Sequence, residues 1–213
     1  MLCEKYLRNV PLPDDLTNDN IYQAMRKTQD IFALIHENTG LNLTDFIQAN
    51  SFSGMVSNIY TKTLGEISVY RPYHDQRYPD LMHENKKIGL EIKTSNKPMK
   101  GGEGHNGHSG WHLVVCFTPL ENGEIEFSQA EIAYLTGYGL ENADWKYMGS
   151  KRNQNNSQRT ETYVTTNIGT AKLRDGTVYF NPELIQISRI LLKKRTLLSQ
   201  TLPIPPFSPF YLS

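Results

Sequence analysis

Residues 78–94 read YPDLMHENKKIGLEIKT, and the pattern of this segment decides the fold that the sequence predicts. Two short stretches, 78–83 and 88–94, are separated by the polar, turn-like residues 84–87. Runs of this kind joined by a short polar connection are typical of a β-hairpin. We therefore expect two neighbouring antiparallel strands here.

The second of these strands has one aliphatic and one polar face. Aliphatic residues at positions 88, 90 and 92 alternate with Gly89, Glu91 and Lys93. Because side chains alternate along a strand, Glu91 and Lys93 are expected to face the same way. In a hairpin, Asp80 on the preceding strand can approach them, which predicts two hard oxygen ligands beside a lysine and hence a Mg²⁺ site. The alternative is an exposed ion pair on the solvent face of an edge strand.

Helical patterns precede the hairpin. Apolar residues recur at steps of three and four over 18–37, and Gly40 follows as a stop signal, which predicts an amphipathic helix. A second stripe begins near Ser51 and reaches Glu66, so this helix is expected to end its inward face in a carboxylate. The alternative for Glu66 is a solvated position at a helix end, since Gly65 could already terminate the helix.

The rest of the chain predicts further alternation of strands and helices. A glycine-rich loop at 97–110 leads to a buried strand at 111–118, and strands are expected at 163–167 and 177–180. Ser128 and Glu131 have capping-box spacing, which predicts a short helix ending near Gly137 or Gly139. The sequence Asn-Pro-Glu at 181–183 predicts the start of a C-terminal helix that ends at residues 193–195.

Length and composition limit the architecture. A chain of 213 residues favours a single domain spanning 1–213. We expect an α/β fold with a central mixed β-sheet flanked by helices. The tail at 201–213 contains four prolines, so it cannot extend the last helix and is expected along the surface or on a partner subunit.

Charge and cysteine content indicate how the chain would bind a polyanion and in which cellular compartment it is expected. Lys plus Arg and Asp plus Glu both number 22, so any polyanion must be bound through local clusters of basic residues. Cys3 and Cys116 lie far apart, and Cys116 is inside an apolar run, which suits a free thiol. No leader pattern or stretch of about 20 apolar residues is present, so a cytoplasmic location without membrane contact is expected.

Two polar segments are candidates for contact with DNA. Each carries side chains suited to phosphate or base-edge contacts. The first, at 97–112, offers Lys97, Lys100, His105, Asn106, His108 and Ser109, together with His112. The second, at 146–160, offers Lys151, Arg152, Asn153, Gln154, Asn155, Asn156, Gln158 and Arg159. The alternative for the second segment is a solvated loop, and the three histidines of the first lack the cysteine or carboxylate that would complete a zinc site.

Pro79 and Asp80, followed by Glu91, Ile92 and Lys93, resemble the motif of the PD-(D/E)xK nuclease superfamily, and the polar segment after it looks most like the type II restriction endonucleases. The resemblance implies a restriction-endonuclease-like fold in which Asp80 and Glu91 bind Mg²⁺. It further implies that the carbonyl of Ile92 is a ligand, that Lys93 orients or deprotonates the attacking water, and that Glu66 is a helix-borne catalytic acid.

The same resemblance implies sequence-specific hydrolysis of double-stranded DNA by a homodimer, with a companion DNA methyltransferase in the cell. Three alternatives remain open at this stage. A repair or junction-resolving nuclease would keep Asp80, Glu91 and Lys93 but recognise DNA structure. A non-catalytic module would bind DNA through residues 151–159, and a protein-interaction role would use the C-terminal helix and tail.

Overall fold

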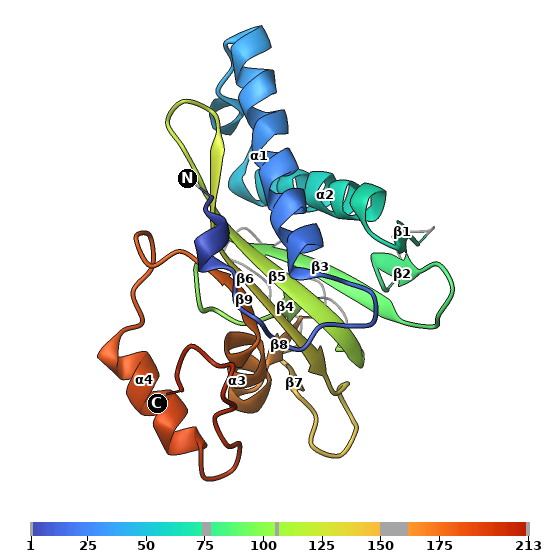
Figure 1. Cartoon of the computed structure of the whole chain (residues 1–213), viewed down its shortest axis with the longest axis vertical. Coiled ribbons are helices and arrows are strands. Elements are labelled where there is room, and N and C mark those ends of the chain that lie inside the picture. Colours follow the sequence, from blue (N-terminus) through green and yellow to red (C-terminus); the bar gives the residue numbers. More distant parts are fainter. Residues whose placement is uncertain (1, 74–77, 105–106, 150–161, 212–213) are drawn as a thin grey trace.

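The computed structural model of the chain describes residues 2–73, 78–104, 107–149 and 162–211 (Figure 1). A six-stranded sheet forms its centre, in the order β1-β2-β3-β5-β6-β9. Its strands are β1 (Tyr70–Pro72), β2 (Leu81–His83), β3 (Gly89–Ser95), β5 (Gly110–Pro119), β6 (Ile125–Leu135) and β9 (Thr177–Phe180). Only β3 and β5 pair in parallel among these neighbours, so the mixed sheet of the predicted α/β class is confirmed.

The predicted hairpin is β2 and β3. The two strands are antiparallel, with Leu81 opposite Leu90 and Met82 opposite Gly89. The first strand is shorter than predicted, because it begins at Leu81 and leaves Asp80 immediately before it. Gly89 lies against the ring of Pro79, where an added Cβ would be 2.4 Å from Pro79 Cγ. The close approach of Pro79 therefore explains why position 89 is a glycine.

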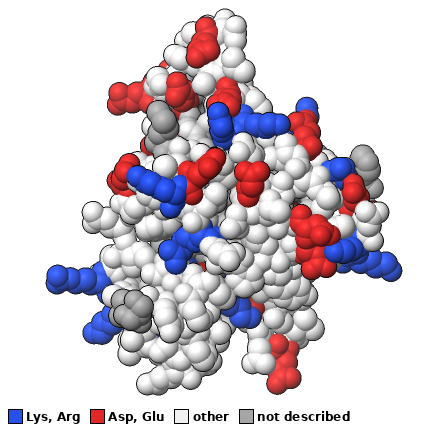
Figure 2. Space-filling view, in the orientation of Figure 1, with Lys and Arg blue, Asp and Glu red and all other residues white. Residues whose placement is uncertain are grey.

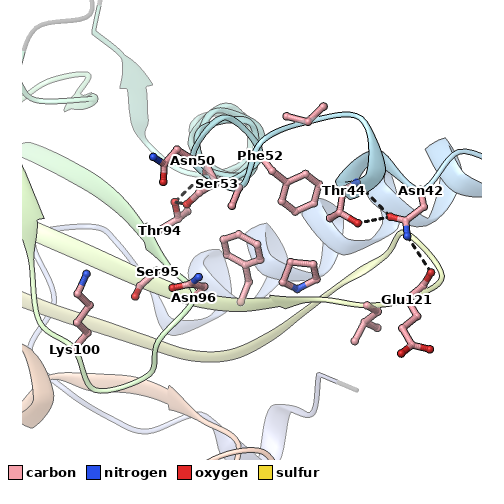
Figure 3. Close-up of a pocket in the computed structure, with 15 residues that line it drawn as sticks. Asn42, Thr44, Asn50, Phe52, Ser53, Thr94, Ser95, Asn96, Lys100 and Glu121 are labelled. Carbon is pink, nitrogen blue, oxygen red and sulfur yellow. Dashed lines mark hydrogen bonds between the residues drawn. The ribbon is translucent and has the colours of Figure 1, made fainter. Parts of the chain in front are cut away.

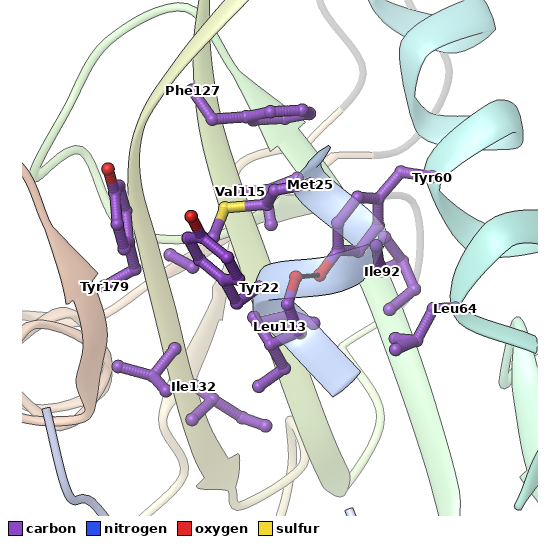
Figure 4. Close-up of a cluster of buried hydrophobic side chains, with 14 of the residues drawn as sticks. Tyr22, Met25, Tyr60, Leu64, Ile92, Leu113, Val115, Phe127, Ile132 and Tyr179 are labelled. Atoms are coloured by element: carbon purple, nitrogen blue, oxygen red, sulfur yellow. Dashed lines mark hydrogen bonds between the residues drawn. The ribbon is translucent and has the colours of Figure 1, made fainter. Parts of the chain in front are cut away.

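Helices α1 (Asn18–Thr39) and α2 (Ala49–Ile67) cover one face of the sheet, as the apolar periodicity predicts. Thr17 and Asn20 form a capping box at the start of α1, and Gly40 ends it in a left-handed conformation. Figure 4 shows the core between these helices and the strands, where Met25 and Tyr60 meet Ile92, Leu113 and Val115.

The other face is covered by helix α3 (Asn167–Asp175) and a three-stranded sheet. That small sheet has the order β4-β8-β7, with β4 (Glu103–Gly104), β8 (Tyr163–Thr165) and β7 (Trp145–Tyr147). Val114, which points away from the main core, packs there with Leu135, Trp145 and Leu173. Both faces of the central strands are thus buried. Short 3-10 helices at Glu4–Tyr6 and Leu43–Asp45 and helix α4 (Arg189–Leu198) complete the elements.

Two predictions of helix position are wrong. Residues 128–135 belong to strand β6 and not to a helix, because residues 129–135 pair in unbroken register with residues 110–116 of β5. Its Ser-x-x-Glu signature is a coincidence of spacing: Gln129 and Glu131 lie on one face of the strand and Ala130 and Ile132 on the other.

The C-terminal helix begins at Arg189, capped by the side chain of Ser188, and not after Asn181. The Asn181 side chain instead accepts a hydrogen bond from the Glu183 N–H in a local turn. Sequence reasoning also missed α3, which starts within the strand predicted at 163–167, since β8 ends at Thr165 and Thr166 caps the helix.

The C-terminal tail packs on its own chain. Phe210 is 1% exposed, and the Ser208 hydroxyl donates to Asp175 Oδ1 at 2.7 Å. Arg8 donates to the carbonyl of Phe207. The described part of the tail is therefore integral to this fold. Over the described residues, none of the helices has the length and apolar character needed to cross a membrane.

Candidate metal site

The structure brings Asp80, Glu91 and Lys93 together at the β2–β3 hairpin. Asp80 Oδ2 accepts a hydrogen bond of 2.7 Å from the Ile92 N–H, which fixes this carboxyl group beside β3. Glu91 Oε1 and Lys93 Nζ form an ion pair at 2.5 Å. Ile92 points into the core, so Glu91 and Lys93 lie on the opposite face, as the alternation predicts.

Glu91 is buried in the sheet, with 7% of its surface exposed, and β3 lies between β2 and β5. The alternative of an exposed ion pair on an edge strand is therefore excluded for Glu91 and Lys93. Burying a carboxylate is costly unless it is paired. The Glu91–Lys93 pair meets this need only in part, because Glu91 Oε2 has no hydrogen-bond partner among the described residues.

Two carboxyl groups share this buried position. Burial raises the pKa of Asp80, and the negative charge of Glu91 raises it further, against the opposing effects of the Ile92 N–H and Lys93. A divalent cation would remove the repulsion and satisfy the unpartnered oxygen of Glu91, so the donor set fits Mg²⁺. Within the described ranges, no group of three or more His, Cys, Asp or Glu side chains is arranged to hold a metal, so the cluster supplies two carboxylates.

The proposed backbone ligand lies in the same strand. Ile92 is in register with Leu113 of β5, in the middle of the parallel ladder. A role for its carbonyl oxygen as a metal ligand remains a prediction.

Glu66 lies in the last turn of α2, which continues through Gly65 to Ile67. Its side chain is exposed, whereas the inward face of the helix is formed by Val56, Tyr60 and Leu64. The predicted inward position of Glu66 is therefore wrong. Gly65 packs closely against β1, because an added Cβ would be 3.0 Å from Pro72 Cδ.

Sequence reasoning assigned His112 to a recognition loop, but the structure places it beside the acidic cluster. It is in register with Glu91 on the neighbouring strand, buried, and its Nδ1 lies 2.9 Å from the Gly110 carbonyl oxygen. Burial, aided by the charge of Lys93, lowers the pKa of His112 to about 4, so the imidazole is neutral at pH 7. The parallel register that makes this contact cannot be read from a single sequence.

In the first predicted recognition segment, some residues are exposed and others form hydrogen bonds within the fold. His108 is exposed with its ring centroid 4.7 Å from that of Tyr78, and Tyr78 donates to the Ser109 carbonyl at 2.6 Å. Ser109 Oγ accepts from the Gly137 N–H. Lys97 is exposed beside Ser95, whose hydroxyl bonds its backbone.

Lys100 lines a pocket of about 570 Å³ at the carboxyl end of β3 (Figure 3). Its other walls include Asn50 and Ser53 from the start of α2 and Thr94 from β3, and Ser53 and Thr94 are joined by a hydrogen bond of 2.9 Å. The pocket begins one residue beyond Lys93. Polar amides and hydroxyls here are suited to sugar and phosphate oxygens.

His105 and Asn106 of the first segment lie outside the described residues. The same holds for every predicted contact residue of the second segment: Lys151, Arg152, Asn153, Gln154, Asn155, Asn156, Gln158 and Arg159. Their contact with DNA remains a prediction.

Charge is unevenly distributed although the chain is neutral. On the face shown in Figure 2, acidic side chains gather over the upper part, whereas the lower left edge, where α4 lies, carries Lys and Arg side chains and no acidic ones. The sequence of α4 contains Arg189, Lys193, Lys194 and Arg195.

A buried carboxyl group on the same face of the sheet gives a testable pH dependence. Glu131 accepts a hydrogen bond of 2.7 Å from Gln129, and burial raises its pKa from 4.5 to about 7, against the opposing charge of Arg174. The folded state therefore holds this proton more tightly than the unfolded state, so its stabilising effect is complete below pH 4.5 and is lost as pH rises through 7.

We expect the free energy of unfolding of wild type, relative to Glu131→Gln, to fall by up to about 3 kcal/mol between pH 4.5 and 8. Urea denaturation at a series of pH values measures this difference. The glutamine can still accept from Gln129, so it mimics the protonated acid. A difference that is independent of pH would show that Glu131 keeps an ordinary pKa.

Comparison of the chain with protein-family models, with curated protein sequences and with solved structures returned no match. The arrangement of its own residues therefore carries the functional argument.

Proposed function

We propose that this chain is a Mg²⁺-dependent DNA endonuclease of restriction-endonuclease-like fold, acting as a type II restriction enzyme on double-stranded DNA. One observation carries the proposal: Asp80 and Glu91 are held together in a buried position, with one Glu91 oxygen unpartnered and Lys93 adjacent. Two carboxylates and a lysine at a β-hairpin supply the groups that the hydrolysis of a phosphodiester needs.

Asp80 and Glu91 would hold the metal ion, with the Ile92 carbonyl as a further ligand. When bound, Mg²⁺ neutralises charge on the scissile phosphate and lowers the pKa of water. The ion pair with Glu91 holds Lys93 Nζ beside the cluster. From this position the ammonium group of Lys93 would orient the attacking water by donating a hydrogen bond to it, and only the neutral amine form of Lys93 would accept the proton of that water. The hydrogen bond from the Ile92 N–H holds the Asp80 carboxyl group in one orientation, so this side chain need not change rotamer to bind the metal.

The remaining parts of the proposal follow from the resemblance to type II restriction endonucleases. The enzyme acts in the cytoplasm as a homodimer that matches a two-fold recognition site, beside a methyltransferase that protects the host sequence. Glu66 serves as an additional acid if DNA binding brings it to the cluster. Residues 97–112 and 146–160 supply the contacts to bases and phosphates.

Digestion of a defined phage DNA by the purified protein tests this function. With Mg²⁺ we expect discrete fragments, and with EDTA or with Asp80→Asn we expect intact DNA. Asparagine can still accept from the Ile92 N–H, so this variant removes the charge and keeps the local fold. Asp45→Asn, at an exposed carboxyl group, is the matched control and should cut like wild type.

Two other results would indicate a different function for this chain. Metal-dependent smearing, or cutting confined to branched substrates, would indicate a structure-directed nuclease that uses the same three residues. Intact DNA on every substrate, combined with DNA affinity that is indifferent to Mg²⁺ or Ca²⁺, would indicate a non-catalytic binding module.

A further inference from the structure

Three tyrosines form an aromatic cluster on the small sheet. Tyr147 and Tyr163 are paired across β7 and β8, with ring centroids 5.2 Å apart, and Tyr138 packs on both at 6.3 and 5.3 Å. Tyr138 and Tyr147 remain 52% and 41% exposed. The cluster therefore presents large ring surfaces that the fold holds in place but leaves accessible.

The cluster is linked to the candidate metal site through packed side chains, because Tyr163 packs against the hydrophobic cluster that contains Trp145. His112 is in register with Glu91, and the Trp145 ring packs on His112 with centroids 5.1 Å apart. Trp145 lies on β7 two residues before Tyr147, so both side chains are on the same face of that strand. Packed side chains thus lead from Glu91 through His112 and Trp145 to Tyr163, which packs against the same hydrophobic cluster as Trp145.

Gly107 lies where this path meets the first recognition segment. An added Cβ would be 2.9 Å from both Tyr138 and Tyr163 and 3.2 Å from Trp145, so the backbone packs directly on the aromatic side chains. The Gly107 carbonyl also accepts a hydrogen bond of 2.7 Å from the Tyr138 N–H. The next residue, His108, contacts Tyr78 beside Asp80. The segment thus connects the cluster to the site from a second side.

The sequence between the two strands that carry the cluster is basic. Residues 148–162, which connect β7 to β8, contain Lys151, Arg152 and Arg159 against the single acid Glu161. Single-stranded nucleic acid is bound by exposed aromatic rings together with basic, amide-rich sequence, because bases stack on the rings and cations attract the phosphates.

We infer that Tyr138, Tyr147 and Tyr163 bind a nucleic-acid strand extending from the candidate metal site, by stacking of its bases on the exposed rings. This inference rests on the proposed function, since it takes the strand to be part of the nuclease substrate. The ligand class is an unpaired or locally opened strand, held by its bases without sequence preference.

Binding of a 2-aminopurine-labelled oligonucleotide, single-stranded or in duplex, to the whole chain in EDTA tests this inference without cleavage. We expect Tyr138→Ala to weaken affinity for the single strand by about 5- to 100-fold and to reduce the fluorescence quenching that reports stacking. Tyr138→Phe should bind like wild type, because its ring is intact. Tyr211→Ala, at a similarly exposed tyrosine on the tail, is the matched control.

Unchanged affinity and quenching in Tyr138→Ala would overturn the inference, whether or not the chain cuts DNA. An equal loss in Tyr138→Phe would assign binding to the hydroxyl group and likewise overturn stacking. Tyrosine-dependent binding in a chain that never cleaves would support the inference and reject the nuclease function. Circular dichroism of each variant verifies folding.

Discussion

Replacing Lys93 by alanine is expected to lower Mg²⁺-dependent DNA cleavage by at least about 10²- to 10³-fold, the effect of removing one group that stabilises developing charge. The residue lies 2.5 Å from Glu91 in the buried acidic cluster, where the electrostatic effect of a single ammonium group is large. DNA affinity should be nearly unchanged, because one partly buried lysine contributes little to binding by many phosphate contacts. Single-turnover cleavage and a binding titration in Ca²⁺ measure the two quantities.

The controls separate catalysis from folding. Loss of Lys93 leaves the Glu91 carboxylate without its cation, so Lys93→Met, which keeps the apolar stem, is compared for folding by circular dichroism. Lys97→Ala removes a nearby exposed lysine and is expected to reduce cleavage only slightly. Cutting retained by a folded Lys93→Ala protein would remove Lys93 from the mechanism.

Replacing Arg195 by alanine is expected to lower the free energy of unfolding by about 3–5 kcal/mol, because it leaves a buried carboxylate unpaired. The side chains of Arg195 and Asp175 are only 2% and 5% exposed and are joined at 2.7 Å. Arg195 also donates to the carbonyls of Leu202 and Pro203, and Ser208 donates to Asp175. The pair therefore ties α4 and the tail to the end of α3. Urea denaturation followed by circular dichroism measures the loss.

Lys193→Ala, on the exposed side of the same helix, should change stability by less than about 0.5 kcal/mol. Arg195→Lys keeps the charge but not the planar fork, so an intermediate loss is expected. A decrease below about 1 kcal/mol for Arg195→Ala would mean that water enters and solvates Asp175, and that the tail does not depend on this pair.

Local signals were read correctly where the structure uses local interactions. The apolar period of α1 and its stop at Gly40 both act within a few residues. The hairpin of β2 and β3 is likewise a contact between neighbours in the chain. Errors arose where pairing with distant strands overrides a local pattern: residues 128–135 carry a helix-start signature, but seven successive residues of β5, 110–116, hold the segment as a strand.

The candidate site likewise combines features set by local sequence with features set by contacts between distant residues. The sequence by itself determined that Glu91 and Lys93 share one face of a strand and that Asp80 lies across a short turn, because alternation and a hairpin are local geometry. Only the tertiary structure decided that this face is buried, that His112 lies beside Glu91, and that Trp145 packs on His112 within the hydrophobic cluster that Tyr163 also contacts. These relations depend on the parallel register of β3 and β5 and on a second sheet packed over them, contacts between residues far apart in the chain that no local pattern encodes.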